Sequence, residues 1–188
     1  EYRYENIPTF IFSRQGEKMG SFEDVTSQAA VGAGFLLSDA MSLEMALQAE
    51  QLQPEELIGI FPTSQGREET QLAKVTAQLH YDTLDDLAFP RRGIKFNARY
   101  AHSSQRFDSQ LDYRRLQVAV DYYKTWANRV RLRLRGFYGW SDGDLPLQKY
   151  FNQGHPNTFV GVNYDQLRSS NIAIGRIDFD VRTAEQMA

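Results

Sequence analysis

The chain is 188 residues long, with 41% hydrophobic and 24% charged residues, which is enough for one domain of ordinary size and too apolar for a disordered chain. A formal net charge of -3 argues against a nucleic-acid-binding protein, and the lack of cysteine excludes disulfides, thiolate metal sites and a cysteine nucleophile. No apolar run of about 18 residues predicts a transmembrane helix, but the alternating strands of a transmembrane barrel escape that test.

Apolar and polar residues alternate in a series of segments along the chain, and this period of two predicts about seven or eight β-strands. The segment 42–52 is also rich in good helix formers, but its alternation favours a strand. Short and long connections roughly alternate between the segments, with short ones at 38–40 and 125–128 and longer ones at 13–24, 53–69, 82–93 and 103–112. The expected strands are 9–14, 27–37, 42–52, 71–81, 94–100, 113–123, 128–140 and 171–182.

Arginines line one face of the expected strand 128–140, while its apolar residues share the other parity. Four like charges at two-residue spacing repel one another unless carboxylates on neighbouring strands pair with them. Acidic residues stand at suitable positions of the strands 113–123 and 171–182. We therefore predict an inward-facing charge network made of Arg129, Arg131, Arg133, Arg135, Asp121, Asp178 and Asp180.

Strands of about ten residues with alternating connection lengths and aromatic residues near their ends are typical of an antiparallel transmembrane β-barrel. The chain is expected to be all-β, forming such a barrel or a fragment of a larger one. A soluble antiparallel barrel or sandwich that acts as a binding module is the alternative, because one apolar face would give the same alternation.

The stretch "YDTLDDLAFPRRGIKFNARY", residues 81–100, has a tyrosine, an acidic turn and a Pro-x-x-Gly before an alternating strand. Proline suits a strand entrance and glycine a bend, while the adjacent Asp85 and Asp86 favour a turn over a calcium site. The stretch resembles the strand entry of the bacterial surface antigen domain, the barrel of the outer-membrane assembly-factor superfamily of BamA and TamA. The residues that carry this resemblance are Tyr81, Pro90 and Gly93.

A second stretch, "GDLPLQKYFNQGHPNTFVGVNYDQL", is similar to the long inward-folding loop of the same family. The family's arginine is missing, and Val160 stands in its place, so protein-insertion activity does not carry over by this motif. The form "FVGVNYDQL" is closer to barrels that follow patatin-like phospholipase domains in autotransporter-like proteins. The matching positions are Leu145, Pro146, Phe151, Gly154 and Gly161.

The resemblance implies an outer-membrane barrel, of sixteen strands in the family, that anchors, translocates or displays a passenger domain in the same or another chain. Residues 1–188 would then form one barrel domain or part of one, with the segment 142–171 folded into the lumen. A self-contained eight-stranded barrel, or one completed by a second chain, also fits the length. The expected partners are outer-membrane lipid, the passenger and a further copy of the chain in a homo-oligomer. No cofactor, metal or nucleic acid is expected, and the chain is not expected to be an enzyme.

One pair of residues suggests a different class of protein, an integral outer-membrane phospholipase. In "YAHSSQR", His102 and Ser104 lie two residues apart, so they share a strand face that the parity places towards lipid. A histidine can act as the base for a serine hydroxyl. The polar end of a strand is the competing interpretation, because His and Ser are common beside a turn.

Overall fold

The computed structural model describes residues 2–12, 18–59, 69–127, 129–152 and 168–181. Eight strands form one antiparallel sheet in the order β1-β2-β3-β4-β5-β6-β7-β10, and β8 pairs with β9 in a separate two-stranded sheet. Within these residues the large sheet is not closed, and β1 and β10 are its edges. The all-β antiparallel fold predicted from the sequence is confirmed as part of a barrel. The strands of the large sheet are β1 (Tyr2–Phe12), β2 (Lys18–Ser38), β3 (Met41–Gly59), β4 (Thr70–Asp82), β5 (Gly93–Ser103), β6 (Tyr113–Trp126), β7 (Val130–Gly143) and β10 (Ile172–Val181).

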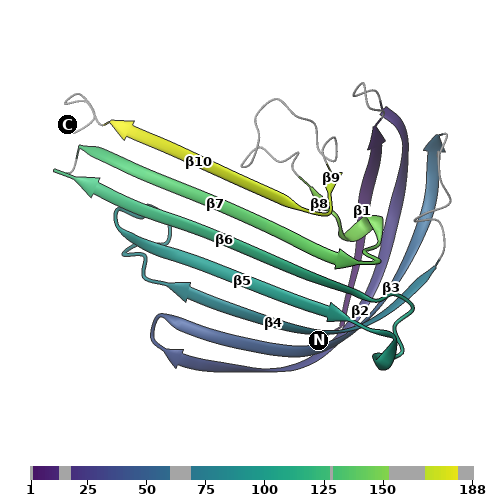
Figure 1. Cartoon of the computed structure of the whole chain (residues 1–188). Coiled ribbons are helices and arrows are strands. Elements are labelled where there is room, and N and C mark those ends of the chain that lie inside the picture. The colour runs from purple at the N-terminus through teal and green to yellow at the C-terminus, as the bar shows by residue number, and fades with distance from the viewer. Residues whose placement is uncertain (1, 13–17, 60–68, 128, 153–167, 182–188) are drawn as a thin grey trace.

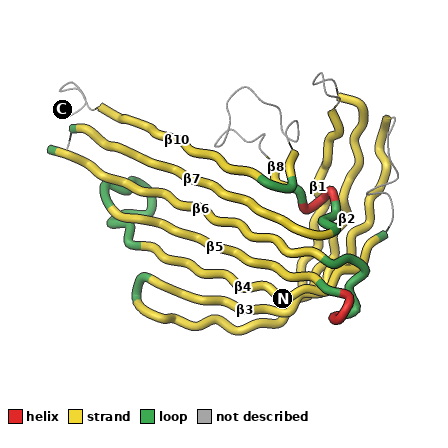
Figure 2. The backbone as a smooth tube through the Cα atoms, viewed as in Figure 1, coloured by secondary structure: helices red, strands yellow, loops and turns green. Residues whose placement is uncertain are grey.

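The sheet is bent, so that β1 and the adjoining parts of β2 and β3 rise on one side of the molecule while β7 and β10 lie on the other (Figure 1). The 3-10 helix η2 (Leu147–Lys149) and the short strands β8 (Phe151–Asn152) and β9 (Arg168–Ser169) lie near the bend, in the connection from β7 to β10. The 3-10 helix η1 (Gln105–Phe107) belongs to the connection from β5 to β6, at the same end of the sheet as η2 (Figure 2).

Connections at the two ends of the sheet differ in length. The end at which β2 meets β3 and β6 meets β7 has tight turns at 39–40 and 127–129, together with the longer turn 83–92. At the opposite end lie the connections 104–112 and 144–171. The longest of these connections, 144–171, therefore lies at the end opposite the two tight turns, as the longer external loops lie opposite the short periplasmic turns in outer-membrane barrels.

Two connections expected from the sequence were wrong in their bounds. Residues 18–24 and 53–59 belong to β2 and β3, where Gly20 pairs with Gly59 and Asp24 pairs with Pro54. The alternation is irregular in both stretches, and the ladder contains a register shift between Ser21 and Phe22. Backbone hydrogen bonding continues the hairpin where the side-chain pattern does not mark it, because β1 and β3 flank β2 there.

The two faces of the sheet have different chemistry. The face that contacts η2 and β8, called the inner face below, carries most of the charged side chains of the strands. On the opposite, outer face, apolar residues line up across neighbouring strands, as in the register row of Leu43, Leu79, Ala98, Val118 and Tyr138. Large apolar side chains exposed on this face include Val31, Met45, Leu47, Tyr81, Ile94, Val120, Ile177 and Phe179.

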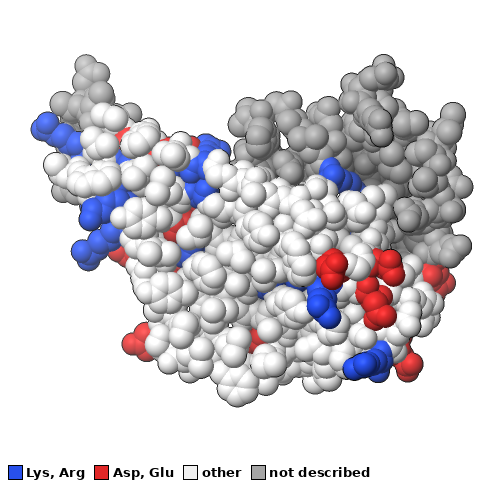
Figure 3. All heavy atoms as spheres, in the orientation of Figure 1, with Lys and Arg blue, Asp and Glu red and all other residues white. Residues whose placement is uncertain are grey.

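The apolar outer face has the dimensions of a membrane-spanning band. On β7 every second residue from Val130 to Trp140 faces outwards, and all of these are apolar. Ten residue steps span about 33 Å along a strand, which a tilt of about 40° reduces to about 25 Å, the height of the lipid-facing band of outer-membrane barrels. In Figure 3 the visible face is white across its middle, with charged groups gathered towards its ends.

The turn between β4 and β5 is held by backbone and side-chain hydrogen bonds. The Thr83 amide donates to the Ile94 carbonyl at 2.9 Å, and the Ile94 amide donates to the Thr83 hydroxyl at 3.0 Å. Gly93 has a φ of 117°, and a Cβ there would lie 2.3 Å from the Thr83 carbonyl oxygen. The proline and glycine of the strand-entry motif therefore have structural roles, because Pro90 is buried and Gly93 makes the close approach possible.

Two carboxylates cap the backbone of this turn. Asp85 accepts hydrogen bonds from the amides of Arg91 at 2.9 Å and Arg92 at 3.1 Å, and Asp86 accepts from the amides of Ala88 and Phe89 at 2.8 and 2.9 Å. These hydrogen bonds favour the charged form, so they hold the pKa of Asp85 and that of Asp86 below the usual value. The expected turn is confirmed in this part of the chain.

Replacing Gly93 by alanine should destabilise the folded protein by more than about 1 kcal/mol, because the added Cβ meets the Thr83 carbonyl and the positive φ is unfavourable for alanine. The matched control is Gly175→Ala, since a Cβ at Gly175 has no atom within 4 Å. Urea unfolding of the micelle-folded protein, followed by tryptophan fluorescence, measures both. Equal unfolding midpoints for the two variants would contradict this account of the turn.

Acidification should loosen the turn 83–92. A carboxylate whose pKa is lowered by folding contributes stability above the ordinary Asp value of 3.8, and that stability is lost as the pH falls through the lower folded pKa. The measurement is the protection of the Arg91 and Arg92 amides against hydrogen exchange, corrected for the intrinsic rate at each pH. Asp85→Asn keeps an oxygen acceptor that does not titrate, so in that variant the protection of these two amides should no longer depend on pH below 3.8.

Candidate functional site

The inner face of β6, β7 and β10 carries an ion network. Arg131 donates to Asp180 at 2.6 Å, and Arg133 lies 3.0 Å from Asp121. Arg135 lies 3.9 Å from Asp121 and 3.5 Å from Asp178. Asp178 also accepts a hydrogen bond from Arg176 at 2.6 Å, so this carboxylate pairs with two arginines. Each arginine of the strand thus has a carboxylate within reach on a neighbouring strand.

Arg129 lies outside this network. The sequence placed it at the start of the β7 ladder, but β7 begins at Val130, and Arg129 belongs to the tight turn, where its amide donates to the Trp126 carbonyl at 3.0 Å. Its side chain is exposed. The ladder therefore has three arginines rather than four, because the chain turns before the alternation ends.

A second cluster joins the β7–β10 connection to the sheet. Glu50 of β3 has a side chain only 1% exposed, and it accepts hydrogen bonds from Lys74 of β4 and from Lys149 of η2. The Lys74 side chain is 8% exposed. A carboxylate buried to this degree is costly unless it is paired, and here two ammonium groups, one from the sheet and one from the connection, pair with it.

An aromatic contact lies beside that cluster. Phe151 is 2% exposed, its ring meets the edge of Phe137 at 6.1 Å, and the Arg115 guanidinium lies 4.5 Å from its centroid. A Cβ on Gly139 would lie 2.7 Å from both Phe151 and Ile172. The absence of a side chain at Gly139 therefore makes room for the Phe151 ring on β7. The connection is therefore held on the inner face by an ion pair and by an aromatic ring fitted to a glycine.

The predicted loop-motif residues lie at the start of this connection. Leu145 packs against the buried cluster of Leu52, Leu72 and Tyr113, and Pro146 precedes η2. Phe151 occupies the glycine-lined position described above. Gly154 and Gly161 lie outside the described residues. The motif thus contributes apolar contacts at both ends of η2.

His102 and Ser104 make separate contacts in the described part of the chain. His102 lies at the outer face of β5, where its ring meets Phe107 edge-on at 6.1 Å. The Ser104 hydroxyl caps η1 by accepting from the Arg106 amide at 3.3 Å. Both residues line one hollow, but Nδ1 of His102 has no hydrogen-bond partner among the described residues.

Neither a metal cluster nor a membrane-spanning helix occurs among the described residues. No three His, Asp or Glu side chains gather closely enough there to hold a metal ion. Across the same residues, no helix has the length and apolarity needed to cross a membrane.

The comparisons with known proteins agree with the architecture. The sequence model of the Omp85 superfamily domain matches residues 7–186, almost the whole chain. The chain belongs to the Omp85 superfamily. This confirms the resemblance to the surface antigen and assembly-factor barrels, whose members are bacterial outer-membrane proteins. Among curated proteins, none matches the chain.

Membership of the Omp85 superfamily gives the apolar outer face its role. The chain is part of an outer-membrane β-barrel of the assembly and translocation type. In such a barrel, lipid-facing and lumen-facing residues alternate along each strand.

The sequence did not predict that Glu50, Lys74 and Lys149 form one cluster. Parity placed Lys74 on the polar face, but no pattern in the sequence marks a carboxylate that a distant loop will bury.

Glu50→Gln should be strongly destabilising, by about 3–5 kcal/mol, because it leaves two lysines near one another without a carboxylate in a buried place. The matched control is Lys95→Ala, which removes an exposed pair with Asp82 at 4.0 Å and should cost about 0–1 kcal/mol. Urea unfolding in micelles measures both variants. A Glu50→Gln protein as stable as the control would show that the cluster does not hold the connection.

Proposed function

We propose that the chain is the barrel part of an Omp85-superfamily protein that anchors, translocates or displays a passenger, and that it performs no covalent chemistry itself. The observation that carries this proposal is the docking of the long β7–β10 connection on the inner face through Lys149 and Phe151. The family match over residues 7–186 supports the barrel setting in which such docking occurs.

The inner face is suited to line a water-filled path for a polypeptide, and the β7–β10 connection would control the width of that path. The ion network of β6, β7 and β10 is half-buried, with Arg133 and Asp121 side chains 31% and 29% exposed, so its charges remain in contact with solvent. A polar wall of paired charges lets a polypeptide pass without binding it tightly, while the docked part of the connection, η2 and β8, narrows the path. Release of this connection would widen it.

Two readouts test the proposal. In planar bilayers, Lys149→Ala and Phe151→Ala should raise the single-channel conductance, because each removes one contact that holds the connection on the inner face. In whole cells, the same variants should lower the amount of passenger that protease can reach at the surface while the barrel itself remains in the membrane. Lys95→Ala, which alters an exposed pair on the same face, is the control and should leave both readouts unchanged.

The phospholipase alternative gives the opposite result in a separate assay. If the chain is an anchor or translocator, phospholipid hydrolysis in mixed micelles is the same for the native protein and for Ser104→Ala. The engagement of the Ser104 hydroxyl as a helix cap supports this expectation. Hydrolysis that is abolished by Ser104→Ala would overturn the anchor proposal.

A further inference from the structure

The outer face has a groove where its apolar band ends. Small residues of β2, β3 and β4 lie opposite one another there, in the register row Ala29, Ala49 and Ala73. The next row towards the membrane centre carries the larger Val31, Leu47 and Val75. The row on the other side is polar, with Ser27, Gln51 and Gln71. The alanine row is thus the floor of the groove, between a row of larger apolar side chains and a row of polar side chains.

Phe107 of η1 bounds this groove. The ring lines a space of about 720 Å³ together with Ala29, Val31, Leu47, Ala49 and Ala73. That volume lies within the range of about 300–1,000 Å³ found for small-molecule sites. The groove is continuous with the outer apolar band, in which Leu47 is 58% and Val31 71% exposed, so a hydrocarbon chain is the ligand that it suits.

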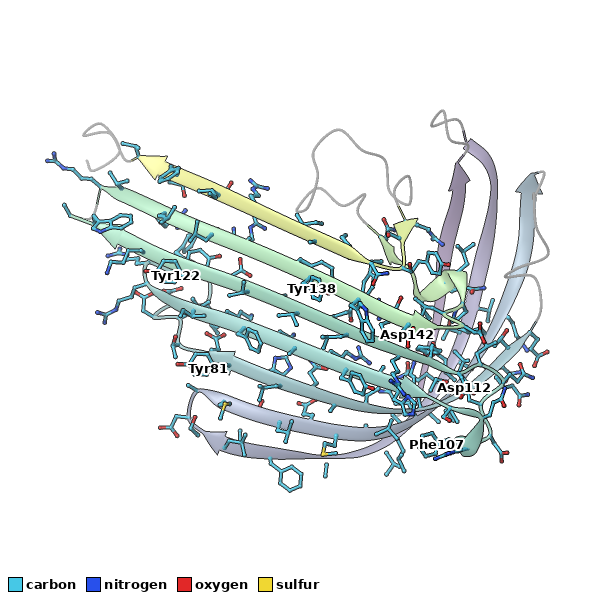
Figure 4. The ribbon with its side chains drawn as sticks, in the orientation of Figure 1. Tyr81, Phe107, Asp112, Tyr122, Tyr138 and Asp142 are labelled. Atoms are coloured by element: carbon cyan, nitrogen blue, oxygen red, sulfur yellow. The ribbon has the colours of Figure 1, made fainter. Side chains whose placement is uncertain are left out.

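A polar hollow of about 440 Å³ lies on the other side of the Phe107 loop. Its lining includes His102, Arg106, Asp112, Arg114 and Asp142, and Figure 4 shows Phe107, Asp112 and Asp142 at one end of the sheet, away from Tyr81 and Tyr122. The side chains of Arg106 and Arg114 are exposed, and neither forms an ion pair within 4.0 Å in the described part of the chain.

The hollow also contains two carboxylates, Asp112 and Asp142. Asp112 accepts from the Gln105 amide at 2.8 Å through one oxygen, and Asp142 faces Arg114 in the register of β6 and β7 without an ion pair within 4.0 Å in the described residues. A ligand that fits here needs anionic groups for the two arginines and hydroxyl donors for the carboxylates. A phosphate alone supplies the anionic group but no hydroxyl donors for the carboxylates.

We propose that the groove and the hollow together bind one phosphorylated glycolipid of the outer leaflet, with an acyl chain along the alanine row, a phosphate at Arg106 and Arg114, and sugar hydroxyls at Asp112 and Asp142. The site lies at the end of the sheet with the longest connection, 144–171, and in outer-membrane barrels the longer loops are on the external side. Phe107 separates the two halves and rests against the His102 ring, so it sets the distance between chain and headgroup. The site requires a lipid-facing outer wall and is independent of any passenger.

Native mass spectrometry of the full protein, extracted from outer membranes and delipidated in detergent, tests the site with three probes. These are a diphosphorylated acylated glucosamine disaccharide, its monophosphorylated form, and phosphatidylglycerol, which has a phosphate but no sugar. Affinity should fall in that order. Equal affinity for all three would mean non-specific association with the apolar band and would overturn the proposal.

Variants separate the two halves of the site. Arg106→Ala with Arg114→Ala should weaken binding of the diphosphorylated probe by about tenfold, which corresponds to about 1.4 kcal/mol, and should remove the preference over phosphatidylglycerol. Ala49→Leu with Ala73→Leu fills the groove and should weaken all three probes. If that variant does not fold, Phe107→Ala tests the same half from an exposed loop.

Two matched controls complete the experiment. Arg91→Ala with Arg92→Ala removes two exposed arginines at the opposite end of the sheet, and Ala173→Leu adds the same bulk to the outer face of β10. Both should bind the three probes as the native protein does. Weakening by the controls as large as that by the site variants would show that net charge or added bulk, rather than this site, determines lipid binding.

Discussion

The structure depends on one constraint, namely that a single sheet must satisfy two different surroundings at once. Each strand alternates, so every second side chain faces lipid and the others face the interior. The outer wall can then be apolar throughout its height, but the inner wall must pair its own charges. Asp121 meets this need between two arginines of β7, and Asp178 does the same between β7 and β10. The ion network of the inner wall and the apolar band of the outer wall are therefore both results of this alternation.

Alternation was the part of the fold that could be predicted from the sequence. It predicted where most strands lie along the chain, their two faces and the acidic partners of the β7 arginines, because parity is a local property. Strand ends were harder to predict, as Arg129 illustrates: the alternation continues into the turn, and only the hairpin geometry determines where pairing starts. The extra lengths of β2 and β3 were missed for the opposite reason, since pairing continues there without alternation.

The buried cluster of Glu50, Lys74 and Lys149 could not have been predicted from local patterns. Its two ends lie on β3 and on η2, and nothing in either segment specifies the other. The loop resemblance indicated a segment that folds inwards, and it also showed that the family's arginine was absent at Val160. A lysine earlier in the same segment forms the ion pair with the wall. Contacts of this kind depend on how distant segments are arranged in space. A sequence motif can therefore reveal such a contact only if the same position of the motif always makes it.

The order of the strands has a consequence for the time course of folding. Every neighbouring pair in the large sheet is also consecutive along the chain, except that β7 and β10 are separated by the connection 144–171. Hairpins between consecutive strands close short loops, which costs little conformational entropy and favours rapid, stepwise zipping. Pairing of β7 with β10 has to wait for a longer loop to close. We therefore expect the ordering of η2 and β8 against the sheet to shorten the effective loop, so that the docked segment acts as a folding guide for the last strand.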